Sequence, residues 1–116
     1  MEFIYIVITI FGMVAIVGMY LLSLALRSKQ IPKGVTIIHG LMASLGLILL
    51  IIFCFRYDTA GPLTSIVIFI MAALSGFILN YKDLTGKKVP KWLAVAHGLI
   101  AVIGFAFLLG FVFFSS

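Results

Sequence analysis

The chain alternates between four long apolar segments and three short polar connections. The apolar segments cover roughly residues 3–26, 34–55, 62–80 and 92–114. Each is about 20 residues long, and a helix of that length crosses a hydrocarbon core of about 30 Å. The segments lack the residue-by-residue alternation of apolar and polar positions that marks a strand of a membrane barrel. The pattern therefore predicts an all-α membrane protein, a four-transmembrane up-down helix bundle.

Composition leads to the same class of protein. Of the 116 residues, 65% are hydrophobic and only 9% are charged, and a soluble domain of this size cannot bury so much apolar surface. We expect a single membrane domain over residues 1–116, without a soluble catalytic domain. Glu2 precedes the first segment where a cleaved signal would have basic residues, so this segment is expected to be a retained span. Cys54 is the only cysteine, which excludes an intramolecular disulfide.

Positive charge gathers at two of the three connections. Seven of the eight basic residues lie in or beside the first and third connections: Arg27, Lys29, Lys33, Lys82, Lys87, Lys88 and Lys91. The positive-inside rule then places loops 27–33 and 81–91 in the cytoplasm and both termini outside. Topology and attraction to anionic lipids explain the net charge of +5, so nucleic-acid binding is not expected. Size and composition suit a bacterial inner membrane.

The two halves of the chain match at a spacing of 58 residues. Pro32-Lys33 corresponds to Pro90-Lys91, and the triplet beginning at His39 corresponds to the triplet beginning at His97, both reading His-Gly-Leu. Shared proline, lysine and histidine at one spacing are hard to attribute to composition. We interpret the halves, residues 1–58 and 59–116, as tandem copies of a two-helix hairpin. Because each copy has two spans, the repeats are expected to lie parallel in the membrane.

His39 and His97 are the only histidines, and each lies within an apolar segment. A polar side chain there is costly, which makes it a functional candidate. Small residues surround the two histidines, either on the same helix face or at a similar depth on the partner helices: Gly18, Ala43, Gly46, Gly76, Ala101 and Gly104. They could let the helices approach closely or leave space for a flat ligand, and the histidines favour the second interpretation.

The chemistry of the pair favours heme over a bare metal ion. The second and fourth helices of an up-down bundle are diagonal and parallel, which brings His39 and His97 to one depth. A bare zinc or copper ion needs further ligands, and the apolar segments contain no Asp or Glu. Heme iron needs only two axial ligands from the protein. We therefore predict one bis-histidine heme b per chain, with Lys33 and Lys91 near its propionates.

This arrangement resembles small membrane b-type cytochromes, which are four-helix bundles with paired histidines. The resemblance rests on His39, His97 and the small residues near them, and it implies electron transfer with a quinone or a redox protein as partner. The chain departs from the two-heme cytochromes of this kind, which need four histidines. It is also similar to small bacterial membrane proteins with a repeated Pro-x-x-x-x-x-x-His-Gly-Leu pattern, a similarity that carries no function.

Other functions stay open at this point. The same ligands suit heme buffering, sensing or delivery, and titratable histidines suit a small transporter. A structural subunit could use the histidines to join helices without a cofactor. A hydrolase is not expected because Glu2, Asp58 and Asp83 all lie in chain ends or connections; an enzyme of this type would be a membrane oxidoreductase. The sequence also leaves open a homodimer with heme between chains.

Overall fold

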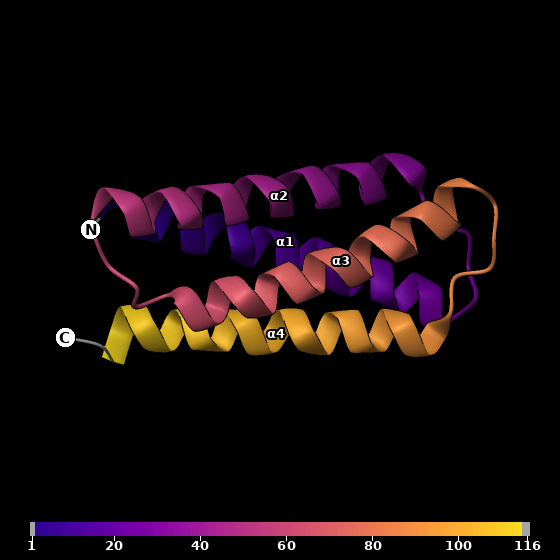
Figure 1. Cartoon of the computed structure of the whole chain (residues 1–116). Coiled ribbons are helices and arrows are strands. Elements are labelled where there is room, and N and C mark those ends of the chain that lie inside the picture. The colour runs from indigo at the N-terminus through magenta and orange to yellow at the C-terminus, as the bar shows by residue number, and fades with distance from the viewer. Residues whose placement is uncertain (1, 115–116) are drawn as a thin grey trace.

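The computed structural model describes residues 2–114, which form four helices joined by short connections (Figure 1). The helices are α1 (Glu2–Leu26), α2 (Lys33–Arg56), α3 (Leu63–Leu84) and α4 (Lys91–Phe114). Each is long and apolar enough to cross a membrane. The molecule measures 44 × 21 × 19 Å, so its length is close to the thickness of a bilayer with its headgroups. The predicted all-helical bundle with four helices of spanning length is confirmed.

The third helix differs most from its expected range. The apolar segment was expected to end at residue 80, but α3 continues for another turn to Leu84. Tyr81, Lys82 and Asp83 are polar enough to end a hydropathy segment, yet they continue the helix because an interfacial turn need not be apolar. The connection between α3 and α4 is therefore residues 85–90, shorter than the loop 81–91 expected from the sequence.

The two connections next to the lysines begin with the same backbone turn. Ser28, after α1, has a φ of 54°, and Gly86, after α3, has a φ of 75°. The N–H of Lys29 donates to the Leu24 carbonyl at 2.9 Å, and the N–H of Lys87 donates back to the last turn of α3 at 2.8 Å. A left-handed residue followed by such a hydrogen bond closes a helix and reverses the chain. Both connections can therefore be short and ordered.

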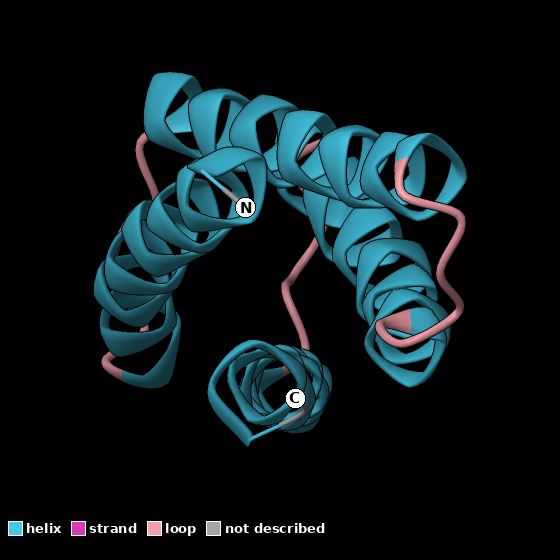
Figure 2. Ribbon diagram, turned by 90° about the vertical axis from the view of Figure 1, so that its left-hand side faces the viewer, coloured by secondary structure: helices cyan, strands magenta, loops and turns pink. Residues whose placement is uncertain are grey.

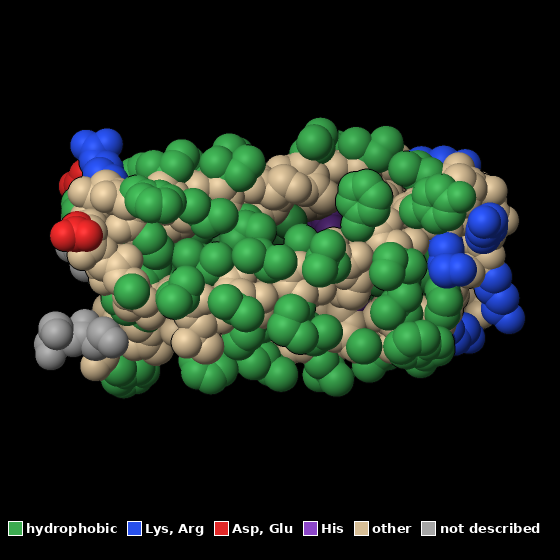
Figure 3. Space-filling view, in the orientation of Figure 1, with side chains coloured by type: hydrophobic (Ala, Val, Ile, Leu, Met, Phe, Trp, Pro, Cys, Tyr) green, Lys and Arg blue, Asp and Glu red, His purple; other side chains and the backbone are tan. Residues whose placement is uncertain are grey.

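The helices run alternately up and down around a common axis (Figure 2). α1 and α3 each pack against both α2 and α4, so α1 faces α3 across the axis and α2 faces α4. Lysine and arginine side chains gather at the end of the bundle that carries connections 27–32 and 85–90 (Figure 3). We call this the basic end. α2 and α4 both begin there and run in the same direction.

The lateral surface of the bundle is apolar along its length (Figure 3). Phe55, Phe77 and Phe114 expose 83%, 76% and 88% of their surface. Exposed aromatic side chains of this kind would be unfavourable in water over so much of a small molecule, whereas they suit contact with lipid.

The hydrophobic core fills the half of the bundle away from the basic end. Its fully buried members come from all four helices: Ile4, Val7, Phe11, Leu50, Phe53, Ile66, Phe69 and Leu108. Phe11 and Phe69 stack across the axis with ring centroids 4.3 Å apart and planes 4° apart. Such a pair stabilises the fold by about 1 kcal/mol beyond its buried area. This pair is the last layer of the core on the side of the basic end.

Candidate functional site

His39 of α2 and His97 of α4 meet across the bundle axis. Their ring centroids are 6.3 Å apart, and their planes lie at 81° to each other. Both side chains are partly buried, and histidine atoms are visible at the bottom of a hollow between apolar side chains in Figure 3. The structure thus brings together the two residues that the sequence singled out, on diagonal helices that run in the same direction.

Each imidazole lies against a glycine of the neighbouring helix in its own hairpin. A Cβ atom on Gly18 of α1 would come within 3.0 Å of Cε1 of His39, and one on Gly76 of α3 within 2.8 Å of Cε1 of His97. These distances are too short for ordinary packing, so a larger residue would displace the ring. Gly18 and Gly76 therefore provide a notch for an imidazole, and in this structure the imidazole edges occupy these notches.

Hydrogen bonds hold His97 in one orientation. Its Nδ1 lies 2.8 Å from the Ala72 carbonyl oxygen and 3.1 Å from Oγ of Ser75. The Ser75 hydroxyl itself donates to the Ala72 carbonyl at 2.8 Å. Because a carbonyl only accepts, Nδ1 of His97 must carry the proton, and Nε2 keeps the free electron pair that a metal requires.

His39 lacks this support. Its Nδ1 is buried and has no hydrogen-bond partner among residues 2–114. In the first half, Val17 occupies the position 58 residues before Ser75, so the serine hydroxyl has no counterpart there. A buried nitrogen without a partner costs roughly 1–3 kcal/mol. The two histidines therefore share a position in their hairpins but have different surroundings.

Ser75 was not expected as a site residue. The comparison of the halves passes over it because its match is an apolar valine. A usable signal was present nonetheless, since Ser75 is a polar residue within an apolar segment and directly precedes Gly76. A hydroxyl in that position is one of the few side chains of the segment that could reach a histidine.

The other predicted glycines contact the next layer of the bundle. A Cβ on Gly46 would lie 3.2 Å from a ring atom of Phe11, and one on Gly104 would lie 3.0 Å from a ring atom of Phe69. Ala43 and Ala101 are half-buried and lie between the two layers along α2 and α4. The stripe of small residues therefore serves both the histidines and the stacked aromatic pair.

Lys33 and Lys91 line one hollow of about 380 Å³ at the basic end, and we call it the basic hollow. It lies between connections 27–32 and 85–90. Its charged lining residues are Lys29, Lys33, Asp83, Lys87, Lys88 and Lys91. The two lysines that the sequence placed near propionates thus border a common space, within about two helical turns of the histidines by residue count.

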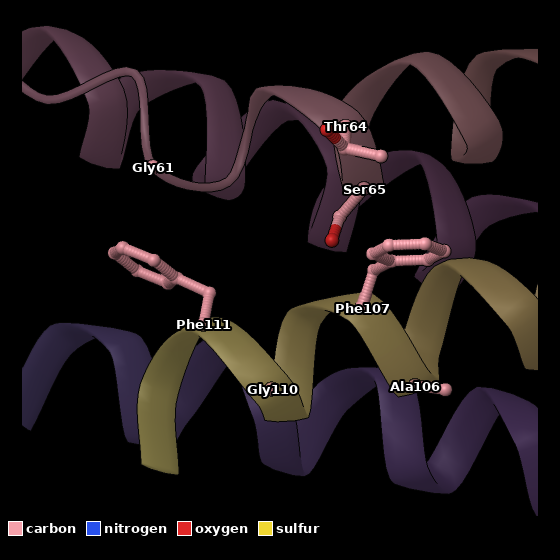
Figure 4. Close-up of a pocket in the computed structure, with 7 residues that line it drawn as sticks. All are labelled: Gly61, Thr64, Ser65, Ala106, Phe107, Gly110 and Phe111. Carbon is pink, nitrogen blue, oxygen red and sulfur yellow. The ribbon is translucent and has the colours of Figure 1, made fainter. Parts of the chain in front are cut away.

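A second hollow, also of about 380 Å³, lies towards the other end of the bundle, between α3 and α4 (Figure 4). Its lining includes Thr64, Ser65, Phe107 and Phe111, and the two rings rise from α4 towards α3 in Figure 4. The residues that line it include neither a charged side chain nor a histidine. It therefore contains none of the predicted site residues.

The donor set suits only a metal that needs few protein ligands. Among residues 2–114, no group of three or more His, Cys, Asp or Glu side chains is close enough to hold a metal ion. Cys54 is a free, half-buried thiol near the end of α2 that lies away from the basic end. His39 and His97 thus act as a pair without a third ligand in this part of the chain.

Comparisons with protein-family models, curated protein sequences and solved structures gave no match. The functional argument therefore rests on the residues and their geometry.

Proposed function

We propose that this chain is a small membrane b-type cytochrome that holds one heme between His39 and His97 and transfers electrons. A quinol or a cytoplasmic reductase would be its partner. The observation that carries the proposal is the approach of two imidazoles across the bundle axis, with ring centroids 6.3 Å apart. No other pair of potential ligands meets in the interior of the described bundle.

The separation of the rings fits two ligands of one metal. Two metal–nitrogen bonds of about 2 Å, together with the distance from each nitrogen to its ring centre, amount to roughly 6 Å. His97 also has the support that metal-binding histidines usually have, because its Nδ1–H donates to the Ala72 carbonyl. The imidazoles would have to turn from the notches at Gly18 and Gly76 to accept a porphyrin between them.

The surrounding residues suit the remaining parts of such a ligand. When bound, heme supplies one-electron redox chemistry at its iron. Lys33 and Lys91 at the basic hollow would pair with its two propionates. The stacked rings of Phe11 and Phe69 close the bundle on the other side of the histidines and keep water from that direction.

Matching contacts support the proposal that the chain consists of two parallel repeats. Gly18 meets His39 as Gly76 meets His97, with the partners displaced by 58 residues in each case. The glycine contacts to Phe11 and Phe69 have the same relationship. A duplicated hairpin would place the two imidazoles about an approximate two-fold axis along the membrane normal. We further propose that the basic end is cytoplasmic in a bacterial inner membrane.

The test is a visible spectrum of the purified protein in detergent after reconstitution with heme. We expect a Soret band and a reversible change on reduction and reoxidation, with heme retained. His39→Ala and His97→Ala should each abolish the bis-histidine spectrum, whereas Thr36→Ala, one turn before His39 and in α2 as well, should preserve it. Lack of a Soret band in the wild type, or equal heme binding in both histidine variants, would contradict the proposal.

A structural role is the second candidate, because the imidazoles already fill the notches at Gly18 and Gly76. In that case the histidines join the two helices of each hairpin and need no cofactor. A wild type that binds no heme, together with a lower melting temperature in His39→Leu and His97→Leu, would favour this role. Loss of heme during redox cycling would instead indicate heme buffering or delivery.

A further inference from the structure

The basic hollow concentrates positive charge in a concave space. Five of the eight basic residues of the chain line it, and Asp83 is the one carboxylate among its lining residues. α2 and α4 begin at this end with Lys33 and Lys91, and the N-terminus of a helix carries a partial positive charge. The hollow therefore combines side-chain ammonium groups with two helix termini.

This charge is poorly compensated within the protein. Oδ2 of Asp83 is buried and has no hydrogen-bond partner among the described residues, so this oxygen bonds none of the lysines around it. Lys87 places its ammonium group 5.1 Å from the ring centre of Tyr81, which leaves its charge intact. Like charges held around one space repel each other unless an anion is present between them.

We propose that the basic hollow binds a phosphate group, supplied by the headgroup of an anionic phospholipid or by a soluble phosphate. Several ammonium groups and helix N-termini are the usual partners of phosphate oxygens in proteins. The position at the end of four membrane-length helices is the level of lipid headgroups. Lys29, Lys87 and Lys88 have no part in the proposed heme site, so the phosphate site stands independently of heme.

The experiment compares two sources of phosphate in nanodiscs. In nanodiscs of zwitterionic phosphatidylcholine, inorganic phosphate is titrated and followed by the fluorescence of Trp92, the only tryptophan, which adjoins Lys91. In nanodiscs that contain phosphatidylglycerol, lipid retained by the protein is counted by native mass spectrometry. Saturable binding in either arm supports the proposal and identifies the source. Binding in neither arm overturns it.

Matched variants separate a site from general charge. Lys29→Gln with Lys88→Gln removes two charges from the hollow. Arg27→Gln with Lys82→Gln removes two charges from the same end but outside the lining, and the Arg27 guanidinium already bonds back to Ser23. The first pair should weaken binding by roughly tenfold or more, and the second pair by much less. Equal losses in both would overturn the proposal.

Two further variants complete the design. Asp83→Asn removes the one carboxylate and should tighten binding severalfold, and unchanged or weaker binding would contradict the site. His39→Ala with His97→Ala should leave phosphate binding unchanged, because the hollow does not contain the histidines. Failure of the heme proposal and failure of the phosphate proposal are thereby distinguishable. Circular dichroism of each variant checks that the helices are intact.

Discussion

At the scale of single residues, the two histidines have unequal support. His97 donates its Nδ1–H to a backbone carbonyl beside Ser75, while Nδ1 of His39 has no partner in the described chain. Two ligands of one metal that differ in this way would also differ in basicity, because a hydrogen bond from Nδ1–H raises the electron density at Nε2. Ser75 therefore positions His97 without contacting the proposed heme.

We expect Ser75→Val to destabilise the cofactor-free protein by about 1 kcal/mol, because one hydrogen bond of His97 is lost. In the heme-loaded protein the same change should raise the reduction potential, since the imidazole becomes a weaker donor. Thermal unfolding and a redox titration measure the two effects. Val17→Ser is the matched variant in the other half and should act in the opposite direction on both. Equal effects of the two variants would argue against a specific role for Ser75.

At the scale of elements, each hairpin is joined by the contact of an imidazole with a glycine. Gly18 and Gly76 allow α1 to approach α2, and α3 to approach α4, at the level of the histidines. Close approach at small residues is a common means of helix association in membranes. Here a polar ring, rather than a second backbone, uses the space that the glycine leaves.

Gly18→Ala and Gly76→Ala should each destabilise the bundle by roughly 1–3 kcal/mol, because the new methyl group overlaps with the imidazole. Gly12→Ala is the matched control in α1, since a Cβ there meets nothing within 4 Å. Better helix propensity should leave that variant as stable as the wild type or slightly more stable. Unfolding followed by circular dichroism in detergent measures all three. A loss in Gly12→Ala equal to that in Gly18→Ala would contradict the proposed packing.

The helices could be predicted from the sequence because long apolar runs have few alternatives in a membrane protein. Their ends were less accessible: the polar turn from Tyr81 to Leu84 belongs to α3 although it ends the apolar run. The pair His39 and His97 was predictable from spacing alone. The partner of His97 was not, because the role of Ser75 depends on which way one face of α3 turns.

At the scale of the whole molecule, charge is distributed unequally between the two ends. Most lysine and arginine side chains lie at the basic end, whereas Arg56 lies at the other end together with Glu2 and Asp58. The positive-inside rule therefore predicts one orientation strongly, with both chain termini on the far side of the membrane from the cytoplasm.

We expect an alkaline phosphatase fused after Ser116 in a bacterial host to be active, because it would reach the periplasm. Green fluorescent protein fused at the same place should not fluoresce. A fusion within connection 85–90 should give the reverse pattern. Activity of both reporters on one side, opposite to this expectation, would show that other determinants outweigh the lysines.

The overall shape contains more than topology could indicate. The up-down order of the helices follows from short connections, and the diagonal placement of α2 and α4 follows from that order. The uneven filling of the interior does not follow from hydropathy, since all four helices are apolar along most of their length. It depends on which side chains meet, such as Phe11 and Phe69.

The stacked Phe11 and Phe69 rings divide the bundle into two regions of different firmness. On one side the core holds all four helices together, while on the other the interior contains imidazoles, glycines and a charged hollow. The aromatic pair can then act as a pivot, about which the helix ends near the lysines spread while the far ends stay clamped. Backbone amides beyond this pivot should exchange with deuterium sooner than those of the clamped half. A large planar ligand would enter through the yielding end, as paper enters a clip.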